Sequence, residues 1–179
     1  MTHTEWKFFT IADYEEEEQW LREQSRRGLM LEKFTPPLKY EFRETEPVDM
    51  IYRLDYKNEK PDEEYIQMAK DFGWEYVENR LGWHYYRKKA SDAENANDAE
   101  LFSDDASRVE MITHIVKTRL LPLICIFIAV ILPNVFVNSY LGVMAVPFHV
   151  LYTLLFAIYV CLIIHCSIKL KMLREKYRK

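Results

Sequence analysis

The residues that could carry chemistry in this sequence lack the partners that catalysis needs. His84 lies among aromatic residues in a predicted strand, where a histidine usually serves packing or faces water. The run Glu15 to Glu18 is the densest acidic cluster, but an acidic first turn of a helix explains it without catalysis. The chain has only four glycines and shows no phosphate loop, nucleophile elbow, His-Glu-x-x-His motif or paired-cysteine spacing. We therefore expect no catalytic residue, no metal ligand and no cofactor.

Charged residues alternate with apolar ones in two predicted strands, and this pattern is typical of a half-buried sheet. The charged positions are Lys39, Glu41, Arg43, Arg53, Asp55 and Lys57. We expect them to form a mixed-charge patch on the open face of the sheet. Such a patch can bind a protein, although most faces of this kind are merely solvated.

Tyrosines are also numerous in these strands, and aromatic sheets stack single-stranded bases in some RNA-binding modules. The positions are Tyr40, Tyr52, Tyr56, Tyr76, Tyr85 and Tyr86. Residues 1–119, however, carry 18 basic and 27 acidic side chains, a net charge of −9. Because contacts to phosphate dominate such binding, this charge argues against a nucleic-acid partner.

A long uncharged stretch excludes a simple soluble protein. Of the 179 residues, the 49 from Leu120 to Ile168 contain no Asp, Glu, Lys or Arg. As one helix they would extend about 73 Å, over twice the ~30 Å hydrocarbon core of a bilayer. We therefore predict two transmembrane helices, 120–137 and 148–168, with a turn between them. The alternative, a helical hairpin buried in a soluble core, needs more protein than this chain supplies.

Basic residues beside the predicted spans indicate their orientation. They flank both spans, whereas the connecting loop has none: Lys117, Arg119, Lys169, Lys171 and Arg174. We expect these residues to anchor the spans at the inner interface, with both termini cytoplasmic and a short hairpin outside. The start, MTHTEWKFF, lacks the pattern of a signal peptide, so the first span would act as an uncleaved insertion signal. For His149 and His165, near the ends of the second span, we expect snorkelling to the interface or a hydrogen bond between helices.

The pattern of the first ninety residues indicates an internal duplication of one structural unit. Gly28 and Gly73 are 45 positions apart, and the same offset pairs Trp20 with Tyr65 and Leu21 with Ile66. Each half predicts the order β-α-β-β. The expected fold is α+β: a duplicated unit forming one mostly antiparallel sheet of six strands with two helices on one face, followed by a transmembrane helical hairpin.

The composition then changes. Residues 91–105 hold six acids and no base between Ala, Asn and Ser, which is typical of a solvated linker. The expected segments are a cytoplasmic domain over residues 1–90, an acidic linker over 91–107, a juxtamembrane helix over 108–119, two transmembrane helices over 120–168 and a basic cytoplasmic tail over 169–179.

Several blocks of the sequence resemble a bacterial family catalogued as domain of unknown function 2812. They are Trp6-Lys-Phe-Phe9, Glu17-Glu-Gln-Trp-Leu21, Gly28-Leu-Met-Leu-Glu-Lys33, Tyr40-Glu-Phe42, Ile51-Tyr-Arg-Leu-Asp55 and Gly73-Trp-Glu-Tyr76. The resemblance covers roughly Trp6 to Lys89, and the appended spans are similar to those that many members carry. Members are often encoded beside PadR-type transcriptional regulators, which implies a regulated membrane response. The family offers no established catalytic residues to carry over.

The leading hypothesis is a membrane-anchored cytoplasmic module for interaction or sensing, regulatory and not enzymatic. Its expected partners are the lipid bilayer and another protein, either a membrane complex or a regulator linked to a PadR-type system. We expect no nucleic acid and no small-molecule substrate. The alternative is a small accessory subunit of a membrane transport or export complex, in which the hairpin makes the contact. An enzyme acting on lipid or peptide is the third hypothesis, and it requires His84.

Overall fold

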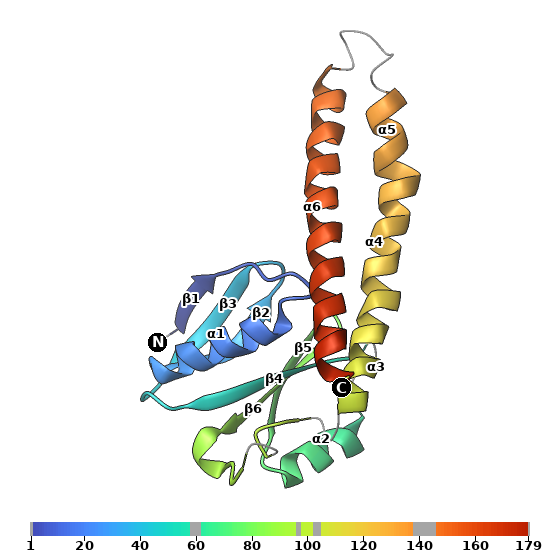
Figure 1. Ribbon diagram of the computed structural model, residues 1–179. Coiled ribbons are helices and arrows are strands. Elements are labelled where there is room, and N and C mark those ends of the chain that lie inside the picture. Colours follow the sequence, from blue (N-terminus) through green and yellow to red (C-terminus); the bar gives the residue numbers. More distant parts are fainter. Residues whose placement is uncertain (1, 58–61, 96–97, 102–104, 138–145, 179) are drawn as a thin grey trace. The chain divides into compact units, whose positions relative to one another are not determined.

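The computed structural model describes residues 2–57, 62–95, 98–101, 105–137 and 146–178 (Figure 1). The chain divides into two units, Met1–Met111 and Ile112–Lys179, which we call the head and the helix pair. Each is described by itself below.

The head contains two antiparallel sheets of three strands each. The first sheet has the order β1-β3-β2, with β1 (Thr2–Trp6), β2 (Leu29–Thr35) and β3 (Lys39–Glu44). The second has the order β4-β6-β5, with β4 (Met50–Tyr56), β5 (Glu75–Arg80) and β6 (Trp83–Lys89). The α+β class is as expected, but the prediction of one six-stranded sheet is wrong.

Each sheet has one irregular edge strand, β2 in the first and β5 in the second. Pairing shifts register between Leu31 and Lys33 in β2, and between Tyr76 and Glu78 in β5. A bulge of this kind bends a strand and ends regular pairing at an edge. Side chains of the second sheet bind the backbone of β2 instead, as described below.

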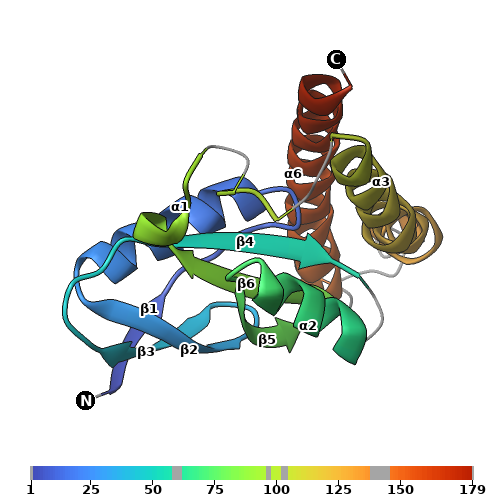
Figure 2. The ribbon, with the colours of Figure 1, turned by 90° about the horizontal axis from the view of Figure 1, so that it is seen from below.

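The two head helices pack on opposite faces of the second sheet. The hydroxyl of Tyr85 on β6 bonds Glu17 of α1 (Tyr14–Arg26), whereas the ring of Tyr86 packs near Tyr65 of α2 (Glu63–Asp71). Successive side chains on a strand point to opposite faces, so these helices cannot share one face (Figure 2). The prediction of two helices on one face is therefore wrong. The reason is that α1 packs not only against the first sheet but also against β4 and β6 of the second sheet.

Between α1 and the first sheet lies an aromatic core. The ring of Trp20 sits 4.8 Å from that of Tyr40 and 5.8 Å from that of Phe42. Leu21, Leu31 and Phe42 are fully buried. This core fixes the axial position of α1, and so fixes where its two buried glutamates point.

The acidic segment after β6 is half-buried rather than fully solvated. It begins with a short 3-10 turn, η1 (Ala90–Asp92), and continues through the described residues 93–95 and 98–101. Its small and apolar side chains pack against the second sheet: Ala90, Ala93, Ala99 and Leu101. We call residues 90–95 and 98–101 the strap.

The first long helix runs without a break from Asp105 to Phe136. It comprises α3 (Asp105–Ile115), η2 (Val116–Leu120), α4 (Leu121–Ile126), η3 (Phe127–Ile131) and α5 (Leu132–Val137). The expected juxtamembrane helix and first span are thus one helix. The segments η2 and η3 are π-helical turns just before Pro122 and Pro133. Proline removes an N–H and crowds the carbonyl four residues earlier, and the wider turn accommodates both effects.

Side chains compensate backbone groups near these turns. The Thr118 hydroxyl donates to the His114 carbonyl over 2.7 Å, and the Asn134 amide to the Val130 carbonyl over 2.8 Å. Such bonds allow proline inside apolar helices.

The second long helix, α6 (Val146–Tyr177), includes most of the segment expected as a tail. In Figure 1 the two long helices run side by side, and the Phe127 ring lies 5.4 Å from that of Phe156. Apart from Ile131, the buried positions of the helix pair among the described residues lie toward the charged ends of both helices: Ile112, Ile115, Leu120, Cys166, Leu170 and Leu173. Most apolar side chains between those ends are exposed. Both helices are long and apolar enough to cross a membrane, which is consistent with a membrane protein.

Two glycines that follow the head helices allow a matched stability test. Gly28 has φ +84° and Gly73 has φ +80°, a conformation that costs other residues about 1–2 kcal/mol. A Cβ on Gly28 would also lie 2.6 Å from the Thr45 carbonyl oxygen, whereas one on Gly73 would meet the flexible Lys88 side chain at 3.3 Å. We expect Gly28→Ala to lower the free energy of unfolding by about 3 kcal/mol or more, and Gly73→Ala by about 1 kcal/mol.

Urea unfolding of the full chain in detergent, followed by tryptophan fluorescence, measures this difference. Trp6, Trp20, Trp74 and Trp83 all lie in the head, so the signal reports the head alone. Equal losses for the two variants would contradict the assigned close approach at Gly28.

Candidate functional site

The six charged residues expected on one open face lie on two different sheets. Lys39, Glu41 and Arg43 belong to β3, and Arg53 and Asp55 belong to β4, which Lys57 follows. The alternation expected within each strand is present, but the two strands do not share a sheet. The role of the six residues in binding a protein stays a prediction.

The outer face of the first sheet is exposed to solvent. Trp6 on β1 is paired in register with Lys39, and its side chain is 69% exposed. Lys39 forms an ion pair with Glu41, and Arg43 lies 3.6 Å from Glu32. We call Trp6, Lys39, Glu41 and Arg43 the open face.

Arg53 and Asp55 of β4, in contrast, lie on a face that other elements of the head cover. Asp55 is 1% exposed and its carboxylate lies 3.3 Å from the ammonium group of Lys57. That ammonium also sits 3.7 Å above the Tyr65 ring. Arg53 and Asp55 share a face of the second sheet with Tyr86 and Lys88, and α2 and the strap pack on this face. We call it the covered face.

Two glutamates of α1 are buried at the centre of the head. Glu17 accepts hydrogen bonds from the Tyr40 hydroxyl at 2.8 Å and the Tyr85 hydroxyl at 2.7 Å. Tyr40 is on the first sheet and Tyr85 on the second, so one carboxylate joins both sheets to α1. Glu18, the next residue, accepts from the backbone N–H of Leu54 at 2.8 Å and lies 3.3 Å from the Arg53 guanidinium.

Burial changes the acidity of both groups. Desolvation raises the pKa of Glu17 to about 7, although the hydroxyl bonds from Tyr85 and Tyr40 act in the opposite direction. Desolvation likewise raises the pKa of Glu18 to about 8, against the opposing effects of the Arg53 charge and the Leu54 N–H. Both carboxyls therefore titrate near neutral pH, a property also found in catalytic acids. Here the groups that they contact belong to the protein's own framework.

A chain of charges extends from Glu18 to the start of the first long helix. Arg53 binds both oxygens of Glu100 in the strap, at 3.0 and 3.1 Å. Glu100 in turn contacts Arg108 on α3. Bidentate pairs between arginine and carboxylate are among the stronger polar contacts in proteins, so Glu100 fixes the strap to both elements.

Side chains also provide hydrogen-bond partners for backbone groups at two strand edges inside the head, those of β2 and β4. On β2, the Leu31 carbonyl accepts from Arg87 at 2.9 Å and the Phe34 carbonyl from Arg80 at 3.0 Å. The Phe34 N–H donates to Glu78. On β4, Ser25 and Glu18 of α1 accept from the N–H groups of Met50 and Leu54. Each edge is thus satisfied by residues from the other half of the head.

His84 and the tyrosines occupy packing positions. His84 is 1% exposed, and its ring lies within hydrogen-bond distance of the Asn79 amide and the Lys57 carbonyl. Five of the six tyrosines considered for base stacking are at most 2% exposed: Tyr40, Tyr52, Tyr56, Tyr85 and Tyr86. They form the core and do not present open faces for stacking.

The expected membrane anchors lie on the two long helices. Lys117 and Arg119 are in η2, and Lys169, Lys171 and Arg174 are in the last turns of α6. Lys171 is largely exposed and lies 3.9 Å from Glu175. Their contact with lipid stays a prediction.

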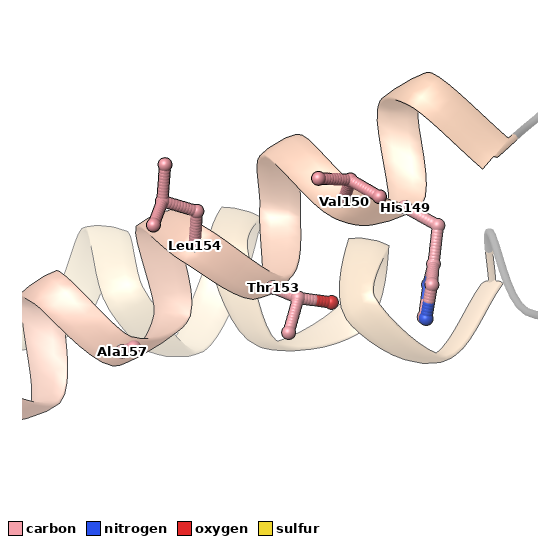
Figure 3. Close-up of a pocket in the computed structure, with 5 residues that line it drawn as sticks. All are labelled: His149, Val150, Thr153, Leu154 and Ala157. Atoms are coloured by element: carbon pink, nitrogen blue, oxygen red, sulfur yellow. The ribbon is translucent and has the colours of Figure 1, made fainter.

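Neither the titratable groups of the described residues nor the depression found on α6 indicates a metal or small-molecule site. Among the described residues, no group of three or more His, Cys, Asp or Glu side chains is arranged to hold a metal ion. A shallow depression on α6 is lined by His149, Val150, Thr153, Leu154 and Ala157 (Figure 3). All five come from one helix, so the depression lacks the converging polar groups of a small-molecule site.

Comparison with protein families identifies the chain. The model of the family described as "Protein of unknown function (DUF2812)" matches residues 13–124, more than half of the sequence. The chain belongs to this family. No curated protein and no solved structure matches it.

The DUF2812 match begins at Asp13 and so includes the two buried glutamates. Their place in an acidic first helical turn does not by itself predict that they are buried. A signal was present, because Glu17 and Glu18 lie three or four residues from Tyr14 and Leu21, which are both buried. This spacing places both carboxylates on the buried side of the helix.

The raised pKa of Glu17 predicts a specific pH dependence of stability. The folded state keeps the proton up to about pH 7, while the unfolded chain loses it near the ordinary value of 4.5. Raising the pH through this window therefore removes stability, on the order of 3 kcal/mol for Glu17. Glu17→Gln cannot ionise, so we expect its free energy of unfolding, relative to the wild type, to increase between pH 4.5 and pH 8.

Tryptophan-monitored urea unfolding at several pH values measures this change. Glu16→Gln is the matched control, because Glu16 is exposed on the same helical turn. A pH dependence that is identical in the wild type and both variants would show that Glu17 does not titrate in this window.

Proposed function

We propose that this DUF2812 protein is a membrane-anchored, non-catalytic module that binds another protein through the open face of its head and acts in regulation. One observation carries the proposal. The antiparallel first sheet exposes Trp6 directly opposite Lys39, and Arg43 lies on the same face at the other end of β3. Tryptophan and arginine dominate the energetics of protein interfaces, because each combines a large contact area with directional polar groups.

The pattern of charge also supports a protein partner. Glu41 lies between Lys39 and Arg43, so the open face presents alternating signs. Such a face fits a partner that carries complementary charges of both signs. It is a poor match for a uniformly anionic surface such as nucleic acid.

The helix pair would hold the head at the membrane. Basic residues flank both apolar segments, and none occurs between them. This distribution supports cytoplasmic termini, a cytoplasmic head and an outer loop. The expected inner-interface anchors are Lys117, Arg119, Lys169, Lys171 and Arg174.

We also propose that the head arose by duplication. Both halves have the order β-α-β-β, and in both the last strand pairs with the other two. Gly28 and Gly73 both adopt positive φ, and the two register shifts lie 45 residues apart. These correspondences support the offset found in the sequence.

Labelling in intact cells tests the proposed topology. In a background without the native cysteines, Ser91→Cys places a thiol on an exposed position of the strap. Ser139→Cys places one in the segment expected outside. A membrane-impermeant maleimide should label Ser139→Cys in intact cells and Ser91→Cys only after lysis. The reverse pattern would overturn the cytoplasmic assignment.

Charge reversal on the open face tests the proposed interaction. We expect Lys39→Glu with Arg43→Glu to reduce the recovery of a cross-linked partner at least tenfold. Arg27→Glu with Lys70→Glu is the control, because it makes the same charge change at exposed positions elsewhere on the head. Partner recovery in the native membrane is quantified by mass spectrometry after in-cell cross-linking.

Replacing the helix pair with an unrelated hairpin separates the proposal from its alternative. A partner that is still recovered after this replacement, but not after the charge reversal, binds the open face. If the partner is still recovered after the charge reversal but is lost when the helices are replaced, the alternative, an accessory subunit of a membrane complex, would be supported instead.

A further inference from the structure

Hydrogen-bond donors line the covered face of the second sheet. Arg53 on β4 is paired in register with Tyr86 on β6, and Ile51 is paired with Lys88. Side chains two residues apart on a strand share a face, so Arg53, Tyr86 and Lys88 form one strip. All three side chains carry hydrogen-bond donor groups, and two are positively charged. At one end of the strip Asp55 lies on the same face, but the Lys57 ammonium is within 3.3 Å of its carboxylate.

The strap supplies acceptors to part of this strip. The Glu100 carboxylate binds the Arg53 guanidinium at 3.0 and 3.1 Å. The Lys88 ammonium donates to the Asp98 carbonyl at 3.3 Å and to the Phe72 carbonyl at 2.9 Å. The contact with Asp98 is long for such a bond, so the strap meets Lys88 weakly.

The middle of the strip is left without an acceptor. The Tyr86 side chain is fully buried, and its hydroxyl has no hydrogen-bond partner among the described residues. A buried hydroxyl without a partner costs free energy. The strap therefore covers the face without satisfying it, which weakens the closed arrangement.

The strap has the composition of a ligand for this face. Its described residues include four acids and no base: Asp92, Glu94, Asp98 and Glu100. Small side chains from Ala93 and Ala99, together with Leu101, pack on the cluster around Ile51, Trp74 and Tyr86. An acidic chain with small side chains thus fits both the charge of the strip and the shallow apolar surface beside it.

We propose that the covered face is a docking site for an acidic, alanine-rich segment of a partner protein, and that the strap occupies this site as an internal competitor. The proposal adds a second surface to the interaction module and rests on that proposed function. A partner segment would displace the strap, place a carboxylate on Arg53 and offer an acceptor to Tyr86.

Competition within the chain sets the expected affinity. A tethered segment acts at an effective concentration that reaches the millimolar range for a short linker. A separate segment of the same chemistry must therefore bind weakly to the wild-type chain and more tightly once the strap is weakened. Because Glu100 also contacts Arg108 on α3, displacement would release the start of the first long helix.

Peptide binding to the purified full chain in a neutral detergent tests the proposal. The probe is a fluorescein-labelled peptide with the sequence of residues 90–101, ASDAENANDAEL. We expect Glu100→Gln to bind this probe at least tenfold more tightly than the wild type does, as measured by anisotropy. Glu94→Gln is the matched control, because it neutralises an exposed strap carboxylate, whereas Glu100 is the carboxylate that binds Arg53. The control should bind like the wild type.

Two further arms identify the determinants. In the Glu100→Gln chain, Lys88→Gln should weaken binding of the probe at least fivefold. A second peptide with Gln in place of the Glu100 residue should bind at least tenfold more weakly than the first. Tryptophan-monitored unfolding verifies that each variant is folded.

Hydrogen exchange of residues 98–101 completes the test, because it reports whether the strap is released. Faster exchange in Glu100→Gln together with no binding of the probe would overturn the docking site. Unchanged exchange would overturn the role of Glu100 in holding the strap. Neither result depends on a cellular partner or on Lys39 and Arg43, so failure here leaves the proposed function of the open face intact.

Discussion

The unpaired strand edges inside the head are the constraint on which its architecture depends. β2 and β4 each present backbone groups that no neighbouring strand pairs, and a buried group of this kind must find another partner. Arg87, Arg80 and Glu78 serve β2, while Ser25 and Glu18 serve β4. Each half of the head therefore completes the other. These contacts link two separate three-stranded sheets, whereas the sequence predicts a single continuous one.

The buried glutamates of α1 follow from the same constraint. One oxygen of Glu17 accepts from tyrosines on both sheets, and Glu18 accepts from the β4 edge while it faces Arg53. Their desolvation is unfavourable, and each hydrogen bond offsets part of it. Titration near neutral pH is thus a consequence of the framework. It does not require an active site, although it makes the stability of the head sensitive to pH.

The strap shows how composition can mislead. Residues 91–105, which include most of the strap, hold six acids among Ala, Asn and Ser and have the composition of a solvated linker. What holds the strap is a surface that the sequence presents elsewhere, with Arg53 on β4 and Lys88 on β6. Long-range complementarity between segments some ten to fifty residues apart leaves no local signal. The split of the charged patch between two sheets has the same origin.

The sequence by itself determined the features that depend on local pattern. The alternation in β3 and β4, the glycines that follow α1 and α2, and the apolar lengths of the two long helices all repeat within a few residues, so they can be read directly. It also identified the DUF2812 family. Only the tertiary structure decided which faces are covered, that α1 and α2 lie on opposite sides of the second sheet, and that Glu17 and Glu18 are buried. Those outcomes depend on which strand edges come together in the fold. Buried polar groups there find their hydrogen-bond partners in segments that are distant in the sequence, so no single segment reveals them.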